Sequence, residues 1–313
     1  MKHVEEMKGL HGIGRDHTFT IHDETGTAKM RYYAVHPGIS LMYADVHMPG
    51  FSCEGRPMAD VFAINHCEEG RIECSFHNGE YLYMGPGDMS FGWRRRTAYC
   101  HEAFFPAAHY HGVSLLVSVS QAQPVLDSRL GEDSIDLRLF CSRFCEEGAE
   151  FSLIMQENDE IKHLFYELYH VPERIKAQYY RLKVFEILLF LSIIDELSVK
   201  RNPVFPKQQV DIVKAIQQEI TQHMARHFTV EQLARKYGIA PSTLKKCFKG
   251  VYGCTIPQYI KEYRIGQAKK QLIHTQNSIL EIANKVGYEN GSKFAVAFQK
   301  ITGRLPGEFR RNY

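Results

Sequence analysis

Apolar and polar positions alternate in short runs between residue 18 and about residue 125. A period of two is typical of β-strands with one buried face, and glycine, proline, asparagine and aspartate separate the runs. Asn78-Gly79 lies between two such runs, 72–76 and 81–84, where it favours the tight turn of a hairpin. Many short strands at this spacing predict a small barrel or sandwich.

The apolar pattern changes to a helical period from about residue 134. We expect one long helix over 177–199, because its apolar positions recur at intervals of three and four residues. A long helix with an apolar face packs on its own domain or against a partner. The residues of this face that we predict to make dimer contacts are Leu182, Phe185, Leu189 and Ile193.

A short proline-containing stretch then interrupts the pattern, and Pro203 and Pro206 make it a stiff, extended linker. We therefore predict an N-terminal domain over 1–202, a linker over 203–206 and an all-helical domain over 207–313. The N-terminal domain should be β-rich to about residue 125 and helical from about 134. The fold class is therefore α+β.

The C-terminal third contains a helix, a tight turn and a second helix. Thr229 with Gln232 three residues later is the signature of a capping box, and Gly238 is a typical residue after a helix end. The second helix is predicted from Pro241 to Phe248. The arrangement is that of a helix-turn-helix unit.

The same pattern recurs about 49 to 50 residues later, with Ser278 and Glu281 as the capping pair, Gly287 at the turn and a second helix over 292–301. A helix over 256–274 should join the two units. Its 19 residues would span about 28 Å, close to the roughly 34 Å between successive major-groove segments on one side of a duplex. A rigid connector of this length would let one chain place two recognition helices in adjacent segments.

The charge of the chain is divided unevenly, although its net value is only +2. Residues 207–313 carry 18 Lys and Arg against 7 Asp and Glu, whereas residues 1–206 carry 20 against 29. The C-terminal third is thus suited to a polyanion such as nucleic acid.

These motifs resemble the DNA-binding domain of AraC/XylS-type bacterial transcription regulators. The resemblance covers about a third of the chain, and it rests on the two repeats and on the ending Gly303-Arg304-Leu305-Pro306-Gly307-Glu308-Phe309-Arg310. It implies a DNA-binding regulator that is not an enzyme. Its N-terminal domain would be a cupin-like barrel with dimerisation helices, and it would bind a small effector. The spacing from Ala63 to Gly70 before a hairpin is also similar to the siderophore-responsive, pyochelin-regulator-like branch.

The resemblance implies that the outward N-terminal face of each recognition helix meets base edges. The base-reading candidates are Ser242, Thr243, Lys245, Lys246, Asn290, Ser292, Lys293 and Val296. Val296 offers only apolar contact, so the first unit should carry more sequence information than the second. The phosphate-contact candidates are Lys249, Ser278, Lys300 and Arg310.

The N-terminal domain offers less specific candidates. Trp93 beside Arg94, Arg95 and Arg96 could clamp an anionic or aromatic effector, but an edge strand with solvated charges is the interpretation we prefer. Trp93, Arg95 and Tyr81 are kept as effector candidates. His109-x-His111 shares one strand face and is a further effector candidate. With Cys100, His101 and Glu102 this pair could also form a metal site, but a solvated histidine pair is the interpretation we prefer. A metal-dependent cupin-type enzyme fused to a DNA-binding domain is therefore the alternative function.

The predicted environment is the cytoplasm. None of the eight cysteines forms a Cys-x-x-Cys pair, the first residues lack the apolar segment of a secretory signal, and no apolar run approaches the 20 or so residues of a membrane span. The missing Cys-x-x-Cys pair also argues against a zinc-cysteine repair enzyme. We expect no metal or other cofactor and no membrane contact. The expected partners are double-stranded DNA, an unidentified small-molecule effector, a second copy of the chain, and RNA polymerase if the chain is an activator.

Overall fold

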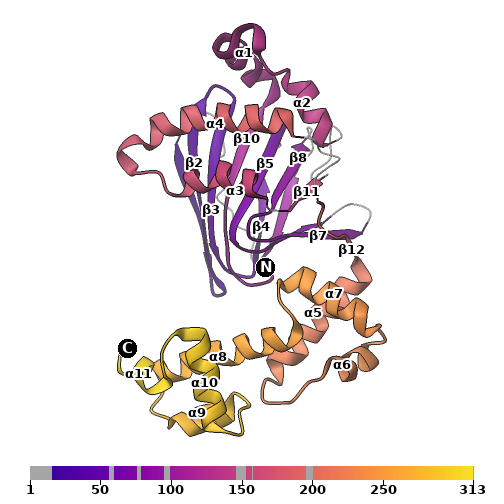
Figure 1. The fold of residues 1–313 in the computed structure, drawn as a ribbon, viewed down its shortest axis with the longest axis vertical. Helices are drawn as coiled ribbons and strands as arrows, with labels where there is room; N and C mark the ends of the chain where they lie inside the picture. Colours follow the sequence, from indigo (N-terminus) through magenta and orange to yellow (C-terminus); the bar gives the residue numbers. More distant parts are fainter. Residues whose placement is uncertain are drawn as a thin grey trace. The chain divides into compact units, whose positions relative to one another are not determined.

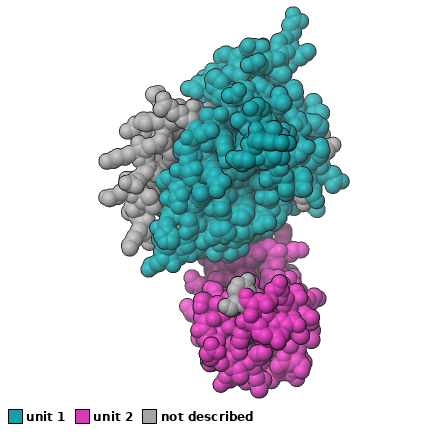
Figure 2. Space-filling view, turned by 90° about the vertical axis from the view of Figure 1, so that its left-hand side faces the viewer, with its two compact units in different colours: residues 1–204 teal, residues 205–313 magenta. Residues whose placement is uncertain are grey.

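The structure is a computed structural model that describes residues 16–55, 60–75, 79–94, 99–145, 153–156, 158–194 and 200–312. The chain divides into two compact units, residues 1–204 and residues 205–313 (Figures 1 and 2). The first unit combines antiparallel sheets with helices, and the second is helical from Lys207 onward. The chain therefore has the predicted α+β organisation. No helix among the described residues is long and apolar enough to cross a membrane.

The larger sheet of the first unit is antiparallel throughout, with the strand order β1-β2-β3-β10-β5-β8-β11. Its strands are β1 (His17–Asp23), β2 (Gly26–His36), β3 (Ile39–His47), β5 (Val61–Gly70), β8 (Met89–Arg94), β10 (Tyr110–Ser118) and β11 (Leu153–Met155). β10 lies between β3 and β5, where Leu115 is paired with Leu41 and with Ile64. All three side chains are fully buried, so strands distant in sequence meet in the core.

The second sheet contains β7-β6-β9-β4 in that order. Its strands are β4 (Gly50–Gly55), β6 (Ile72–Ser75), β7 (Glu80–Met84) and β9 (Tyr99–Phe104). β6 and β7 form the predicted hairpin, with Ser75 paired to Tyr81 and Gly79 at a φ of +79°, whereas residue 78 lies outside the described residues. The strand pairings of the described residues leave both sheets open, so the predicted closed barrel is not confirmed.

The helices of the first unit are α1 (Val119–Leu130), α2 (Leu137–Phe144), α3 (Asp159–Tyr169) and α4 (Lys176–Ile193), with 3-10 turns at Gly131–Asp133 and Glu173–Ile175. Figure 1 shows α3 and α4 lying across one face of the larger sheet. Phe165 of α3 and Leu188 of α4 belong to the same apolar core as Leu41 and Leu115 of the sheet. Covering this face by helices creates the space in which a ligand pocket forms.

Two predicted boundaries differ from the structure. The β-rich region ends at Ser118 rather than near residue 125, because Val119, Ala122 and Leu126 are buried at helical spacing in α1. The long helix predicted over 177–199 ends at Ile193, and residues 195–199 lie outside the described ranges.

The second unit is built from seven helices among the described residues: α5 (Lys207–Gln222), α6 (Val230–Tyr237), α7 (Pro241–Tyr252), α8 (Ile256–His274), α9 (Ile279–Lys285), α10 (Gly291–Thr302) and α11 (Pro306–Arg311). Before them lies the two-residue segment β12 (Phe205–Pro206). The first part of α8 packs with α7, where Tyr259 meets Phe248, and its second part packs with α9, α10 and α11 around Phe294 and Phe298. The single helix α8 therefore joins two small helical cores.

Candidate nucleic-acid interface and ligand pocket

Two helix pairs of the second unit, α6–α7 and α9–α10, begin with the same cap. Thr229 Oγ1 accepts a hydrogen bond from the Gln232 amide at 3.1 Å, and Gln232 Oε1 accepts one from the Thr229 amide at 3.1 Å. Ser278 and Glu281 form the equivalent pair at 3.2 and 2.6 Å. Both predicted capping boxes are therefore confirmed, and each fixes the start of its helix.

A glycine with left-handed backbone follows the first helix of each pair. Gly238 has a φ of +63° and Gly287 a φ of +86°. A Cβ atom at Gly238 would meet nothing within 4 Å, whereas at Gly287 it would lie 2.8 Å from Ala225 Cα and 2.9 Å from Arg264 Cζ. Gly287 is therefore required by space as well as by conformation.

Arg264 of α8 explains the crowding at this turn. Its Nε, Nη1 and Nη2 atoms donate to the carbonyl oxygens of Met224, Gly287 and Arg226 at 2.8, 3.0 and 2.9 Å. The guanidinium also lies 5.8 Å from the centre of the Tyr288 ring. Arg264 thus joins the segment after α5 to the turn between α9 and α10, and it holds the second helix pair in place.

The second helix of the first pair, α7, has an accessible polar face at its N-terminal half. Leu244 and Phe248 point into the core, as predicted. The predicted base-reading residues lie on the other side: Ser242, Lys245 and Lys246 are exposed and Thr243 is partly exposed. These side chains are therefore accessible from solvent, as contact with a groove of DNA would require.

The corresponding helix α10 buries Phe294 and Phe298 and exposes Ser292 and Lys293. Val296 is 68% exposed, a high value for a branched apolar side chain. Asn290 Oδ1 accepts hydrogen bonds from the Ser292 and Lys293 amides at 2.8 and 3.1 Å, so this oxygen already caps the helix. The amide nitrogen of Asn290 is the part of its side chain that remains for a base.

The four phosphate-contact candidates fall into two groups. Lys249 and Lys300 are exposed in the last turns of α7 and α10. In contrast, the Ser278 amide already donates to Glu281 Oε2, and Arg310 Nη2 donates to the Asn277 carbonyl oxygen at 2.5 Å. A phosphate at Ser278 would also meet the negative charge of Glu281. Ser278 and Arg310 therefore have structural partners that a phosphate would have to replace.

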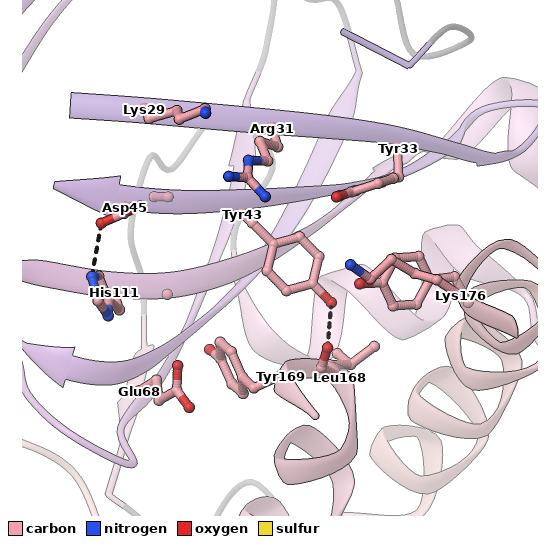
Figure 3. Close-up of a pocket in the computed structure, with 13 residues that line it drawn as sticks. Lys29, Arg31, Tyr33, Tyr43, Asp45, Glu68, His111, Leu168, Tyr169 and Lys176 are labelled. Carbon is pink, nitrogen blue, oxygen red and sulfur yellow. Dashed lines mark hydrogen bonds and ion pairs between the residues drawn. The ribbon is translucent and has the colours of Figure 1, made fainter. Parts of the chain in front are cut away.

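The first unit contains a pocket of about 280 Å³ on the helix-covered face of the larger sheet (Figure 3). Lys29, Arg31 and Tyr33 line it from alternate positions of β2. Tyr43 of β3 and Tyr169 of α3 also line it. The remaining side of the wall comes from Lys176 and Tyr180 of α4, together with Glu68, Asp45 and His111 of the sheet. The pocket thus combines three cationic groups and several phenols with the two carboxylates of Asp45 and Glu68.

Burial keeps the phenols of Tyr43, Tyr169 and Tyr180 neutral at ordinary pH, because it raises the pKa of each. Tyr43 Oη donates to the Leu168 carbonyl oxygen at 2.9 Å, and burial raises the pKa of Tyr43 above its usual value. Burial likewise raises the pKa of Tyr180 to about 12. Lys176 Nζ forms an ion pair with Glu173 at 2.5 Å. Such a wall suits a small polar or anionic molecule, which cations and phenolic hydroxyls hold by directed hydrogen bonds.

Of the effector candidates that the structure describes, only His111 lines this pocket. Trp93 is 2% exposed in the apolar core, and its indole Nε1 donates to Asp60 Oδ1 at 3.2 Å. Tyr81 lies on β7 of the other sheet, and Arg95 lies outside the described residues. Sequence reasoning missed Lys29 and Arg31. Their spacing of two was the available signal, but a polar strand face is usually solvated, and α3 and α4 make it a pocket wall.

The predicted pair His109 and His111 lies together, with 4.6 Å between the ring centres. A third histidine, His47 at the end of β3, joins them, and one nitrogen from each ring lies within 4.8 Å of the others. Sequence reasoning missed His47 because only the pairing of β3 with β10 brings it close. The side chains of Cys100, His101 and Glu102, which were the predicted partners of the pair, lie outside the described set.

The predicted dimer contacts lie on α4. Leu182 is 72% exposed and Ile193 is 79% exposed, and Leu189 is exposed on the same helix. Phe185 instead is half-buried and packs against the ring of His36 at 4.8 Å. The helix therefore has an apolar outer stripe that the described residues of its own unit leave exposed.

Residues 233–312 match a family profile described as "Helix-turn-helix domain". The chain is 35% identical over 99 residues to the bifunctional transcriptional activator/DNA repair enzyme AdaA of Bacillus subtilis, a match that covers 32% of this chain and 47% of that protein. It is 29% identical over 128 residues to the arabinose operon regulatory protein of Salmonella typhimurium, a match that covers 39% of this chain and 46% of that protein. The C-terminal domain of AraT, a response regulator from Geobacillus stearothermophilus, is a similar solved structure, with 30% identity, a TM-score of 0.32 and coverage of 33% and 85%.

The chain spans less than half the length of these two curated relatives. The matched region contains both helix pairs, their caps and their exposed helix faces. By this domain and these relatives, the C-terminal region of the chain is similar to the DNA-binding region of AraC/XylS-type transcription regulators.

Proposed function

We propose that this chain regulates transcription by binding double-stranded DNA through two helix-turn-helix units, and that its N-terminal unit senses a small molecule. The observation that carries the proposal is the repeated helix pair: α6–α7 and α9–α10 share a capping box, a glycine turn and an accessible N-terminal face on the second helix. The net charge of +11 over 207–313 supports a polyanionic partner.

In this proposal α7 and α10 enter successive major-groove segments on one side of the duplex. The 19 residues of α8 span about 28 Å, which is near the spacing of such segments. Lys246 of α7 would donate to the acceptor edge of guanine, whereas Val296 of α10 would contact a thymine methyl group. The α7 unit would therefore contribute more of the sequence preference.

The exposed lysines Lys249 and Lys300 would contact phosphates and fix the register on the duplex. Lys245 and Lys293 would act at the groove edge, either on a base or on the adjacent backbone. Ser242, Thr243, Ser292 and the Asn290 amide nitrogen complete the set of donors on the two helices.

The pocket of the N-terminal unit is the proposed effector site. Lys29 and Arg31, together with the phenols of Tyr33, Tyr43 and Tyr169, would bind a small polar or anionic molecule. A molecule that binds one conformation of the unit better would shift the population of that conformation and so change promoter occupancy. A cupin-like barrel in the N-terminal unit and membership of the siderophore-responsive branch stay predictions.

The apolar stripe of α4 supports a homodimer, because pairing of two such helices would bury Leu182, Leu189 and Ile193. A dimer would place four helix-turn-helix units on two half-sites and raise the affinity through effective concentration. RNA polymerase would be a further partner if the regulator is an activator.

A metal-dependent enzyme fused to a DNA-binding domain is the second candidate, which the histidines at 47, 109 and 111 keep open. The relatives favour regulation, since they are named as regulators and activators, although AdaA is also named a repair enzyme.

The test of DNA binding is a titration of duplex DNA with the full-length chain over a range of salt concentrations. Affinity should fall steeply with salt, because each phosphate that is neutralised releases counterions. The proposal would be refuted if, at low salt, the chain bound DNA no more tightly than a control protein without net charge.

A further inference from the structure

We infer that His47, His109 and His111 form a binding site for one divalent transition-metal ion, with Zn²⁺ as the best-fitting ion. The site lies across three adjacent strands. His111 of β10 is paired with Asp45 of β3 on one side and with Glu69 of β5 on the other. His47 follows Asp45 by two residues, so it projects from the same face of the sheet. The inference stands whether or not the chain binds DNA.

A carboxylate holds one nitrogen of each histidine ring. Asp45 Oδ1 lies 2.9 Å from His47 Nε2 and 2.8 Å from His111 Nε2, and the second of these contacts is drawn in Figure 3. Glu69 Oε2 lies 3.1 Å from His109 Nε2. In the tautomer in which each Nε2 carries the proton and donates to its carboxylate, the three Nδ1 atoms keep their lone pairs for a metal ion. Metal-binding histidines in proteins are oriented by carboxylates in the same way.

Two of the Nδ1 atoms face each other. His47 Nδ1 and His109 Nδ1 are 3.3 Å apart. Two nitrogen ligands at the usual Zn–N distance, on adjacent corners of a tetrahedron, are separated by about 3.3 to 3.4 Å. Two unprotonated nitrogens at this distance repel each other unless a proton or a metal ion lies between them. The spacing therefore fits a metal ion without rearrangement of these two rings.

The surroundings supply a fourth ligand and an entry path. Glu69 Oε2 lies 3.8 Å from His111 Nδ1, so a small movement of this carboxylate would bring an oxygen to the ion. The side chains of His109 and His111 are 33% and 32% exposed, and that of His47 is more exposed still. Three imidazoles with a carboxylate or water suit Zn²⁺ and related borderline ions, and not Mg²⁺ or Ca²⁺, which prefer oxygen ligands.

A local irregularity of the sheet supports a binding role. The pairing of β10 with β5 shifts register between His111 and Gly112, and such bulges commonly re-aim side chains beside functional sites. The shift lets Glu69 reach the histidines while Glu68 lines the ligand pocket. Because His111 and Asp45 also line this pocket, the ion would place positive charge at its edge.

The test is a Zn²⁺ titration of the full-length chain, prepared without a polyhistidine tag and stripped with a chelator. Competition with a chromophoric indicator should give one Zn²⁺ per chain. Co²⁺ in its place should give the visible absorption of a tetrahedral ion without the near-ultraviolet band of a thiolate ligand. That spectrum would distinguish this site from one built on cysteines.

Three variants and one matched control locate the ion. The double variant His109→Ala/His111→Ala and the single variant His47→Ala should lose stoichiometric binding, and Asp45→Asn should lower the affinity about 10- to 100-fold. The control His223→Ala/His227→Ala removes two exposed histidines four residues apart in the second unit and should bind as the original chain does.

The thermal unfolding of each variant is compared with that of the original chain in the presence of chelator, so that a loss of binding is not due to misfolding. If the double variant does not fold, the single variant His47→Ala replaces it in the test. Absence of stoichiometric binding by the original chain would overturn the inference. Unchanged affinity and spectrum in His47→Ala and Asp45→Asn would overturn it equally.

Discussion

At the scale of single residues, the two turn glycines show two separate reasons for a glycine: a left-handed backbone conformation and a lack of space for a Cβ atom. Both have left-handed backbone, but only Gly287 is crowded, by Ala225 and by the guanidinium of Arg264. Arg264 can donate to the Gly287 carbonyl only because no side chain intervenes. The second turn is thus tied to the rest of the unit more tightly than the first.

Replacing each glycine by alanine tests this difference. Gly238→Ala should lower the free energy of unfolding by about 1 kcal/mol, which is the cost of a left-handed alanine. Gly287→Ala should lower it by about 2 to 4 kcal/mol because overpacking is added. Urea unfolding followed by far-ultraviolet circular dichroism measures both. Fluorescence of Trp93, the one tryptophan, reports the other unit and should not change. Equal losses in the two variants would contradict the crowding argument.

A second residue-scale prediction concerns Glu219 of α5. Hydrogen bonds from Lys236 Nζ at 2.7 Å and from Tyr237 Oη at 2.8 Å lower the pKa of its carboxyl group. A lowered pKa means that the ionised form stabilises the folded state above the unfolded pKa and that this contribution is lost as the pH falls.

Glu219→Gln should therefore lower the free energy of unfolding by about 1 to 3 kcal/mol at pH 7, and the difference from the original chain should shrink below about pH 4.5. Glu231→Gln, at an exposed position of α6, is the control and should have little effect. Denaturation curves at pH 7 and pH 4 test the account, which would fail if the loss were the same at both.

Local signals were read correctly from the sequence at this scale. The two capping boxes and the two turn glycines depend on residues within a few positions of one another, so a single segment contains the whole signal. The pocket depends on tertiary structure. Lys29 and Arg31 become pocket residues through α3 and α4, and His47 meets His109 only through strand pairing. No local pattern could have specified those contacts.

At the scale of elements, α4 has two different faces. Leu188 and Leu191 are buried in the core, and Lys183, itself 1% exposed, is paired with Glu167 and Glu186 at 2.9 Å each. The opposite side presents Leu182 and Ile193 to solvent. The sequence indicated a broad apolar face, but it could not separate the part used by the core from the part left over.

The proposed dimer predicts that Leu182→Glu will weaken self-association, because a carboxylate would be buried in the interface. Analytical ultracentrifugation of the full-length chain should show a dimer that becomes largely monomeric in the variant. Leu139→Glu is the matched control, since Leu139 is 66% exposed on α2. If Leu182→Glu and Leu139→Glu sedimented alike, α4 would not be the dimer interface. A monomeric original chain would likewise rule out this interface.

The helices α7 and α10 should differ in what they contribute to sequence preference. Lys246→Ala should weaken binding to a preferred duplex by about 1 to 3 kcal/mol, roughly 5- to 150-fold, and should relax the preference at one base pair. Val296→Ala should cost less, because it removes apolar contact alone. Lys270→Ala, at an exposed position of α8, is the control for loss of charge. Fluorescence anisotropy on matched and mismatched duplexes compares the affinities of the variants. If Lys246→Ala lowered the affinity equally for all sequences, Lys246 would contact a phosphate and not a base.

At the scale of the whole molecule, the two units differ in charge and in architecture. Residues 207–313 carry the excess positive charge and consist of helices, whereas residues 1–206 carry the excess negative charge and contain both sheets. This difference was visible in the sequence because period and charge are properties of whole segments. The open form of the sheets was not, since closure depends on which strands pair.

If two recognition helices read one side of a duplex, a selection followed by footprinting will show it most directly. The full-length chain is used to select duplexes from a random library, and the bound DNA is then probed for groove-specific protection. We predict two protected major-groove segments whose centres lie about 10 to 10.5 base pairs apart for each chain. A single protected segment per chain, or protection without regard to groove, would contradict the account.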